Sequence, residues 1–234
     1  MYGIQLISQN GNQFISKQAA PLLYWGYVDV SFTEGEINKL DYKYQKLFNL
    51  PTSAGATIAV RTISVTNPPT PGTNGAYLWP IKRADGWNVA ISGENPTFTA
   101  RVYVFVDAST VPIPEYGIAV YGDPGEVIFH NGRPSMVYKQ MFYSDIDNPF
   151  TQASTPVPFK PATVVWSPKI ESTGQGYWRY YNTAHSVGSG YGVGMTRVFV
   201  SAAPYNLKII SRYYYPILDA GYYEQFPNLG NYPI

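Results

Sequence analysis

The segment TFTARVYVFVD, residues 97–107, alternates between two sets of side chains along its whole length. Successive side chains of an extended strand point to opposite faces, so residues two apart share a face. One face therefore carries Phe98, Ala100, Val102, Val104 and Val106, and the other carries Thr97, Thr99, Arg101, Tyr103, Phe105 and Asp107. This period of two, with one wholly apolar face, predicts a β-strand.

The composition of the whole chain favours the same secondary structure. The 21 glycines and 20 prolines are spread along 234 residues, which interrupts helices and suits short strands joined by turns. Aromatic residues make up 16% of the chain, and they pack well on a pleated surface. We therefore predict an all-β protein. Residues 34–50 are the exception, because their apolar residues fall at helical spacing, although Tyr42 and Tyr44 also alternate as in a strand.

Two segments have the sequence of a β-hairpin, and they resemble each other. Residues 2–16 turn at Asn10-Gly11, and residues 118–129 turn at residues 122–125; both turns are rich in residues that tolerate positive φ. Further matches follow in the same order along the chain. They are Tyr2-Gly3-Ile4 with Tyr116-Gly117-Ile118 at an offset of 114, Pro21 with Pro134, Tyr24 with Tyr138, Ala56-Thr57-Ile58-Ala59-Val60 with Ala162-Thr163-Val164-Val165-Trp166, and Arg101-Val102-Tyr103-Val104 with Arg197-Val198-Phe199-Val200.

These matches predict two tandem, related β-sandwich-like domains of about 115 residues each. The first covers residues 1–111, and the second covers residues 116–200. Residues 112–115 form a Pro-rich linker, because proline fixes φ and stiffens the connection. Residues 201–234 have no counterpart in this comparison. We expect them to form an aromatic C-terminal extension that packs on the second domain or on a partner.

Aromatic residues of the second half are candidates for binding a partner or a glycan. Tyrosine and tryptophan provide a large contact area at a low cost in side-chain entropy, and they form hydrogen bonds at one end. The five bulky residues 177–181 cannot all point inward from one strand, although alternate members would fill a core. The candidate residues are Tyr177, Trp178, Arg179, Tyr180, Tyr181, Tyr213, Tyr214, Tyr215, Tyr222 and Tyr223.

No catalytic, cofactor-binding or metal-binding arrangement stands out. The chain has no cysteine, which excludes disulfides, thiolate nucleophiles and cysteine-ligated metals. His130 and His185 are isolated from each other, and we expect both in loops or at the surface. Residues 145–148 lack the glycine and glutamate of an EF-hand loop, so we interpret them as a solvated turn. Residues 188–194 lack the lysine of a phosphate loop, so we interpret them as a mobile loop or a bulged strand. No spacing selects a carboxylate pair for glycoside cleavage from Asp145, Asp147, Glu171, Asp219 and Glu224.

The charge and hydropathy of the chain exclude two classes of partner. The net charge is +1, which gives no attraction to nucleic acid. No stretch offers about 18 uninterrupted apolar residues, so we expect no insertion into a membrane.

The hairpin pattern of residues 2–15 and 116–129 resembles the opening of small β-rich tail proteins of tailed bacteriophages. In both hairpins, Tyr-Gly-Ile and a hydrophobic pair precede a glycine and a second hydrophobic pair. The strands at 56–60 and 101–104 are similar to strands of that group, whereas the duplication and the C-terminal extension depart from its single-unit pattern. The resemblance implies a virion structural protein at the tail tip, baseplate or fibre. It implies assembly with other tail proteins and with copies of itself, no cofactor and no enzymatic activity.

A second hypothesis comes from the aromatic run itself. Trp178 and its neighbouring tyrosines would form a stacking platform for a glycan or receptor at the host surface. This hypothesis is compatible with the first, because a protein at the tip of a tail also contacts the host.

Overall fold

The computed structural model confirms the all-β class. It describes residues 20–32, 43–46, 50, 52–66, 76–93, 97–122, 125–145, 155–164, 169–173, 176–187, 190–200 and 212–229. Among these residues, helical structure is limited to the 3₁₀ turn η2 (Ala108–Thr110), the single turn α1 (Ala220–Tyr223) and Leu229. The strands are β1 (Leu23–Phe32), β2 (Lys43–Lys46), β3 (Ala56–Thr66), β4 (Ala76–Arg83), β5 (Gly86–Gly93), β6 (Thr97–Val106), β7 (Ala119–Tyr121), β8 (Val127–His130), β9 (Gln140–Asp145), β10 (Thr155–Val157), β11 (Pro161–Val164), β12 (Lys169–Thr173), β13 (Gly176–Val187), β14 (Gly190–Val200) and β15 (Arg212–Asp219).

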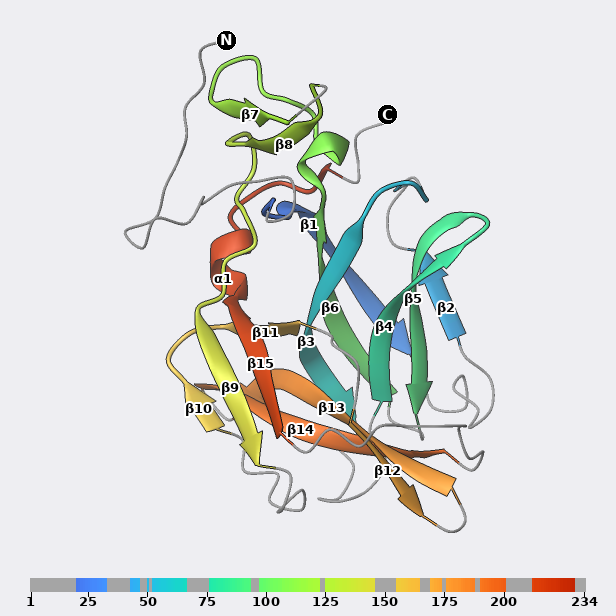
Figure 1. Ribbon diagram of the computed structural model, residues 1–234. Helices are drawn as coiled ribbons and strands as arrows, with labels where there is room; N and C mark the ends of the chain where they lie inside the picture. Colours follow the sequence, from blue (N-terminus) through green and yellow to red (C-terminus); the bar gives the residue numbers. More distant parts are fainter. Residues whose placement is uncertain are drawn as a thin grey trace.

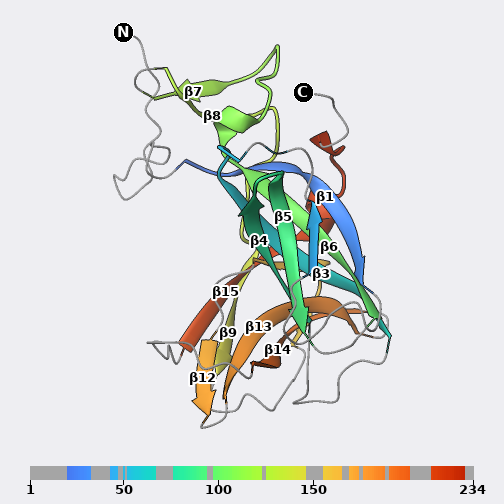
Figure 2. The ribbon, with the colours of Figure 1, turned by 90° about the vertical axis from the view of Figure 1, so that its right-hand side faces the viewer.

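The strands form four antiparallel sheets (Figure 1). The largest has six strands in the order β1-β6-β3-β11-β15-β9. A three-stranded sheet, β2-β5-β4, lies beside its first half, and a four-stranded sheet, β10-β14-β13-β12, lies at one end of the molecule (Figures 1 and 2). The hairpin β7–β8 projects from the opposite end (Figures 1 and 2).

Strand β6 is the predicted strand at residues 97–107, and it is buried on both faces. Its predicted apolar face is fully buried at Ala100, Val102 and Val104. Tyr103 and Phe105, on the face that also carries Arg101, are fully buried as well. The sequence predicted one buried face, whereas the structure covers both, because β4–β5 packs over one face of β6 and α1 packs over the other.

The first core fills the space between the six-stranded sheet and the hairpin β4–β5. It packs Trp25 of β1 and the valines of β6 against Leu78 and Trp87. The indole Nε1 of Trp87 donates a hydrogen bond of 3.0 Å to the carbonyl oxygen of Ala54, so its one polar atom is satisfied within the core.

The second core lies on the other face of the same sheet and draws on both halves of the chain. Tyr24 and Phe105 of the first half pack with Leu218 and Tyr223 of the second. The ring centroids of Phe105 and Tyr223 are 5.0 Å apart in an edge-to-face arrangement. This geometry suits the aromatic quadrupole and fixes α1 against the sheet.

The two halves of the chain share one sheet, so residues 112–115 do not separate two cores. Strand β3 pairs with β11, which joins the two halves through the middle of the six-stranded sheet. Residues 112–115 instead lead from η2 into the hairpin β7–β8, with Ile113 exposed and Val111 buried.

The segment that we expected to be a C-terminal extension contains an internal strand. Strand β15 pairs with β11 on one side and with β9 on the other. We expected this segment to pack on the second domain or on a partner. Residues 212–219 pair with strands of the second half of this chain. Residues 201–211 and 230–234 lie outside the described part of the chain.

The turn predictions have mixed outcomes. The hairpin β7–β8 is confirmed, and Gly125 adopts the positive φ (105°) that its turn requires. Of the two interpretations of residues 34–50, helix and strand, the strand is found at residues 43–46, which form β2 and pair with β5. Strand β14 begins at Gly190 and continues without a break to Val200, so residues 190–194 form a strand. The predicted hairpin at residues 2–16 lies outside the described residues.

Replacing Phe105 tests whether the second core stabilises the whole chain. Phe105→Ala removes a fully buried ring between Tyr24 and Tyr223, and we expect it to lower the free energy of unfolding by about 3–5 kcal/mol. Urea unfolding followed by tryptophan fluorescence measures the change. The exposed Ser109→Ala is the control and should stay within about 0.5 kcal/mol of the parent protein. Equal effects of the two substitutions would contradict this role.

Candidate interaction surfaces

Large apolar side chains are exposed in one continuous region of the chain and at α1. Single exposed apolar residues are ordinary in proteins, but neighbouring ones mark contact sites. Among the described residues, the exposed set is Ile113, Tyr116, Ile118, Tyr121, Val137, Tyr138, Met141 and Tyr222.

Four of these residues belong to the hairpin β7–β8 and the segment leading into it. We call Ile113, Tyr116, Ile118 and Tyr121 the hairpin surface. Tyr116 is 83% exposed and Ile118 is 61% exposed, so neither side chain contributes much to the folded core. Among the described residues, β7 and β8 pair only with each other, and their outer edges are unpaired in this part of the chain.

The hairpin is nevertheless held firmly at its base. His130 is fully buried, which corrects the expectation of a loop or surface histidine. Its Nδ1 accepts a hydrogen bond of 3.1 Å from the backbone N–H of Gly132, which leaves Nε2 to donate to the carbonyl oxygen of Val111 at 3.3 Å. Both ring nitrogens are therefore hydrogen-bonded, and the bond to Val111 connects β8 to the end of η2.

Gly117 has a physical reason to be glycine within the Tyr-Gly-Ile motif. Its φ is 148°, a value that residues with a side chain rarely adopt, and a Cβ there would collide with the amide oxygen of Asn131. The same oxygen accepts a hydrogen bond of 2.9 Å from the N–H of Ile118. The motif therefore fixes the direction in which Tyr116 and Ile118 leave the hairpin.

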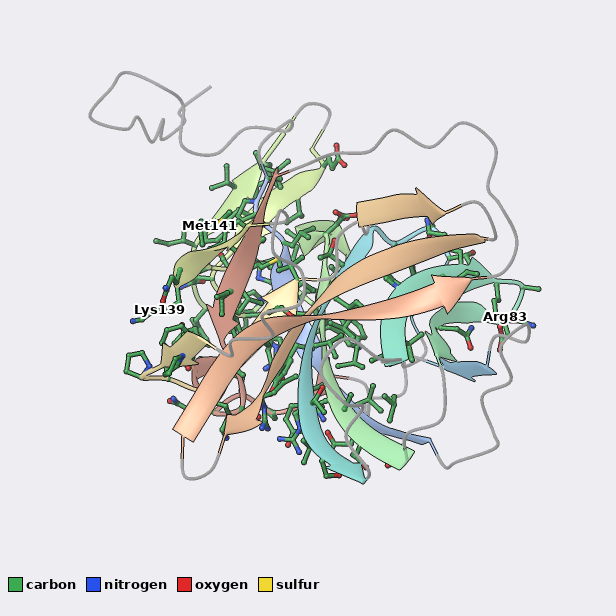
Figure 3. All side chains as sticks on the ribbon, turned by 90° about the horizontal axis from the view of Figure 1, so that it is seen from below. Arg83, Lys139 and Met141 are labelled. Atoms are coloured by element: carbon green, nitrogen blue, oxygen red, sulfur yellow. The ribbon has the colours of Figure 1, made fainter. Side chains whose placement is uncertain are left out.

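A second exposed group surrounds the end of α1. We call Val137, Tyr138 and Tyr222 the α1 surface. The N–H of Val137 donates to the phenol oxygen of Tyr223 at 2.7 Å, and the Tyr222 ring lies 5.2 Å from the Tyr223 ring. Met141 is also exposed, on β9 at an edge of the six-stranded sheet, and Figure 3 shows it on the same side of the molecule as Lys139 and far from Arg83.

The candidate residues at α1 have opposite environments. Tyr222 is 45% exposed, as a binding residue requires. Tyr223 is 1% exposed, so it is not available to a partner. Its hydroxyl donates to the carbonyl oxygen of Ser135 at 2.9 Å, and burial raises its pKa to about 12. Tyr223 is a core residue, because α1 turns its ring onto the sheet.

The other candidate residues lie in two different sheets. Residues 177–181 are part of β13, where Trp178 is opposite Glu171 of β12 and Phe199 of β14. Tyr213, Tyr214 and Tyr215 are part of β15, opposite β9. The structure describes the strands to which these residues belong, but it does not describe their side chains. His185 is likewise described only as a residue of β13.

Glu224 is the centre of a charged cluster that the sequence analysis did not select. Arg61 and Arg101 lie directly opposite each other on β3 and β6, and like charges in such a pair repel. Glu224 follows α1 and places Oε1 3.3 Å from Nη2 of Arg61 and 3.0 Å from Nη1 of Arg101. Its Oε2 is 2.6 Å from Nζ of Lys160.

Three further groups complete the cluster. The phenol of Tyr103 donates to Oε1 of Glu224 at 2.6 Å. Asp29 binds the Arg101 guanidinium through both oxygens, at 2.7 and 2.8 Å. The guanidinium also lies 4.1 Å from the Tyr27 ring centroid, which favours a cation.

The pKa of Glu224 reports the balance of forces in this cluster. Burial alone would raise it, but hydrogen bonds from Lys160 and Tyr103 and the charges of Lys160 and Arg101 outweigh burial and lower the pKa from 4.5 to about 2. The carboxylate is therefore ionised at neutral pH, and every oxygen is occupied by a cation or a phenol. Such a group locks α1 onto the sheet and lacks the free proton of a general acid. The sequence contained no signal for it, because its partners lie 64 to 163 residues away.

Metal sites and membrane spans were also sought in the described residues. In that part of the chain, no three histidine, aspartate or glutamate side chains gather as metal ligands. No helix there is long and apolar enough to cross a membrane. Comparison with known protein families, curated proteins and solved structures finds no match to this chain. The function must therefore be inferred from the surfaces themselves.

Glu224→Gln tests the charged cluster through its pH dependence. The substitution leaves two arginines and a lysine without their shared counter-ion, so we expect it to lower the free energy of unfolding at pH 7 by about 1–3 kcal/mol. Because the folded-state pKa is depressed, the stabilisation by Glu224 is complete above pH 4.5 and is lost as pH falls towards 2. Urea titrations from pH 7 to pH 2 should show the two proteins converging.

The control for this experiment is Glu115→Gln, at an exposed position. We expect it to leave both the stability and its pH dependence unchanged. A stability difference between Glu224→Gln and the parent protein that stays constant down to pH 2 would rule out the ionised Glu224 as the source.

Proposed function

We propose that this chain is a structural protein of a bacteriophage tail, at the tail tip, baseplate or fibre, and that it acts through protein–protein assembly. The observation that carries the proposal is the hairpin surface. Tyr116, Gly117 and Ile118 form the motif that resembles phage tail proteins, and they lead directly into β7. The hairpin β7–β8 projects from one end of the molecule (Figure 1), and Tyr116 and Ile118 expose two large apolar side chains beside it. The resemblance and the exposure point to the same residues.

The hairpin is built to present a surface without changing shape. His130 and Asn131 fix its base, and Val127 and Phe129 pack against the first core. Because the hairpin is ordered before binding, a partner would lose little affinity to the cost of ordering it. Tyr116 and Tyr121 add rigid contact area with a hydroxyl at the edge, which is typical of residues that dominate interfaces.

The expected partner is a tail protein with an apolar surface, or another copy of this chain. The nearly neutral net charge offers no long-range steering towards a highly charged partner. The unpaired edges of β7 and β8 in the described structure also allow a partner to add a strand.

A charge placed in the hairpin surface tests this proposal. Ile118→Asp leaves the backbone hydrogen bonds of Ile118 intact but requires an interface to bury a carboxylate, so we expect incorporation into phage particles to fall at least tenfold. The measurement is the amount of the chain in purified particles, by mass spectrometry, when the variant replaces the parent chain. Met141→Asp, at an exposed apolar position on β9, is the matched control and should incorporate normally.

Three outcomes would count against the proposal. If the parent chain is missing from purified particles, the virion assignment fails. If Ile118→Asp incorporates as well as Met141→Asp, the hairpin surface is not the assembly site. If Trp178→Ala with Tyr180→Ala abolishes saturable binding to host-surface glycans while assembly is unaffected by Ile118→Asp, the glycan-binding hypothesis is favoured instead.

A further inference from the structure

Asn131 and Gly132 form an Asn-Gly pair directly after β8, where the hairpin β7–β8 ends. An asparagine that precedes glycine loses its side-chain amide readily, because glycine has no Cβ to crowd its backbone nitrogen as that nitrogen approaches the asparagine side chain. Both residues are exposed, so water reaches them. The fold adds two hydrogen bonds to this intrinsic reactivity, one on each of the two reacting groups.

The first hydrogen bond is made by the backbone nitrogen of Gly132. Its N–H donates to Nδ1 of His130 at 3.1 Å. Because Nδ1 accepts this bond it carries no proton, and the proton of the neutral ring is on Nε2, 3.3 Å from the carbonyl oxygen of Val111. A backbone N–H usually donates to a carbonyl oxygen, which does not take up the proton, whereas an imidazole nitrogen is a base. The proton of Gly132 is therefore directed at a group that is able to remove it.

The second hydrogen bond is made by the side-chain carbonyl of Asn131. Ile118 binds Asn131 through both of its backbone groups: its carbonyl oxygen accepts from the N–H of Asn131 at 3.0 Å, and its N–H donates to Oδ1 at 2.9 Å. This pair of bonds holds the side-chain amide in one orientation. It also places a donor on the oxygen that becomes negative when Cγ is attacked, as in the oxyanion holes of acyl-transfer enzymes.

We propose that Asn131 is a self-modification site, at which the folded chain converts its own asparagine to aspartate and isoaspartate. In the first step, the backbone nitrogen of Gly132 forms a bond to Cγ of Asn131 and gives its proton to Nδ1 of His130. The bond between Cγ and Nδ2 then breaks, and Nδ2 takes the proton from His130 and leaves as ammonia. Water hydrolyses the resulting succinimide at either of its two carbonyl groups, which yields aspartate or isoaspartate.

The modification changes the connection between the hairpin and the six-stranded sheet. The new carboxylate removes the formal net charge of +1 that the chain carries. Isoaspartate also lengthens the main chain by a methylene group. The chain reaches the sheet shortly afterwards, where the carbonyl oxygen of Pro134 accepts a hydrogen bond of 2.9 Å from the N–H of Tyr24. We therefore expect the hairpin surface to move relative to the sheet, and this reaction does not depend on the proposed role in a phage tail.

The rate of deamidation in the full-length protein tests the proposal. The protein is incubated at neutral pH and digested, and mass spectrometry follows the gain in mass of the peptide that contains Asn131. The same chain unfolded in guanidinium chloride gives the intrinsic rate, and Asn10-Gly11 checks it, because the same dipeptide should react at a similar rate there. We expect the folded protein to modify Asn131 about tenfold faster than the unfolded protein, because only the folded chain supplies the base.

A substitution of His130 separates the base from the packing of the hairpin. His130→Asn offers an amide oxygen in place of Nδ1, which accepts a hydrogen bond from Gly132 but does not take up its proton. We expect this variant to lose the acceleration and to react about tenfold more slowly than the folded parent protein. Val127→Ala is the matched control. It shortens a side chain of β8 that packs against the first core, leaves His130 in place and should keep the parent rate.

Either of two findings would overturn the proposal. A rate at Asn131 in the folded protein that is equal to or below the rate in guanidinium chloride would show that the fold restrains the Asn-Gly pair. Equal rates in His130→Asn and Val127→Ala, whether fast or slow, would show that the imidazole does not act as the base. The comparison of the folded and unfolded parent protein needs no variant, so it remains decisive if His130→Asn does not fold.

Discussion

Strand β6 contributes side chains to two cores, one on each face of its sheet, and the arrangement of the other elements follows from this. Its small and β-branched residues face Trp25, Leu78 and Trp87, while its aromatic residues face Tyr223. Because each face needs a different cover, the chain places β4–β5 on one side and α1 on the other. The first cover precedes β6 directly in the sequence, whereas α1 lies more than 100 residues after it. The second core therefore forms only when both halves of the chain have folded together.

The charged cluster around Glu224 forms because α1 covers the face of the sheet that carries Arg61 and Arg101. Arg61 and Arg101 lie opposite each other on neighbouring strands, and an α1 segment without a carboxylate would bury two like charges. Glu224 supplies the counter-ion, and Lys160 binds its other oxygen. The C-terminal segment continues along the edge strand β1, where the side-chain amide of Asn228 bonds to both the N–H and the carbonyl of Tyr27, at 2.8 and 3.0 Å. This contact, together with the bridge between Leu23 and Ser135, covers part of the edge of β1.

The surfaces available for binding lie outside these two cores. The two cores stabilise the sheet, and the exposed Ile118 belongs to neither of them. A substitution at Ile118 therefore leaves the packing of both cores unchanged.

The sequence alone predicted the all-β class, strand β6 and the hairpin β7–β8, because alternation and turn residues are properties of a few consecutive residues. It also indicated an internal duplication. The continuation of the sheet from β3 to β11, the burial of Tyr223 and His130, and the position of Glu224 were decided by the tertiary structure. Glu224 and Arg61 are 163 residues apart. A contact over that separation depends on which faces remain to be covered after the strands have paired, and no local pattern in the sequence encodes it.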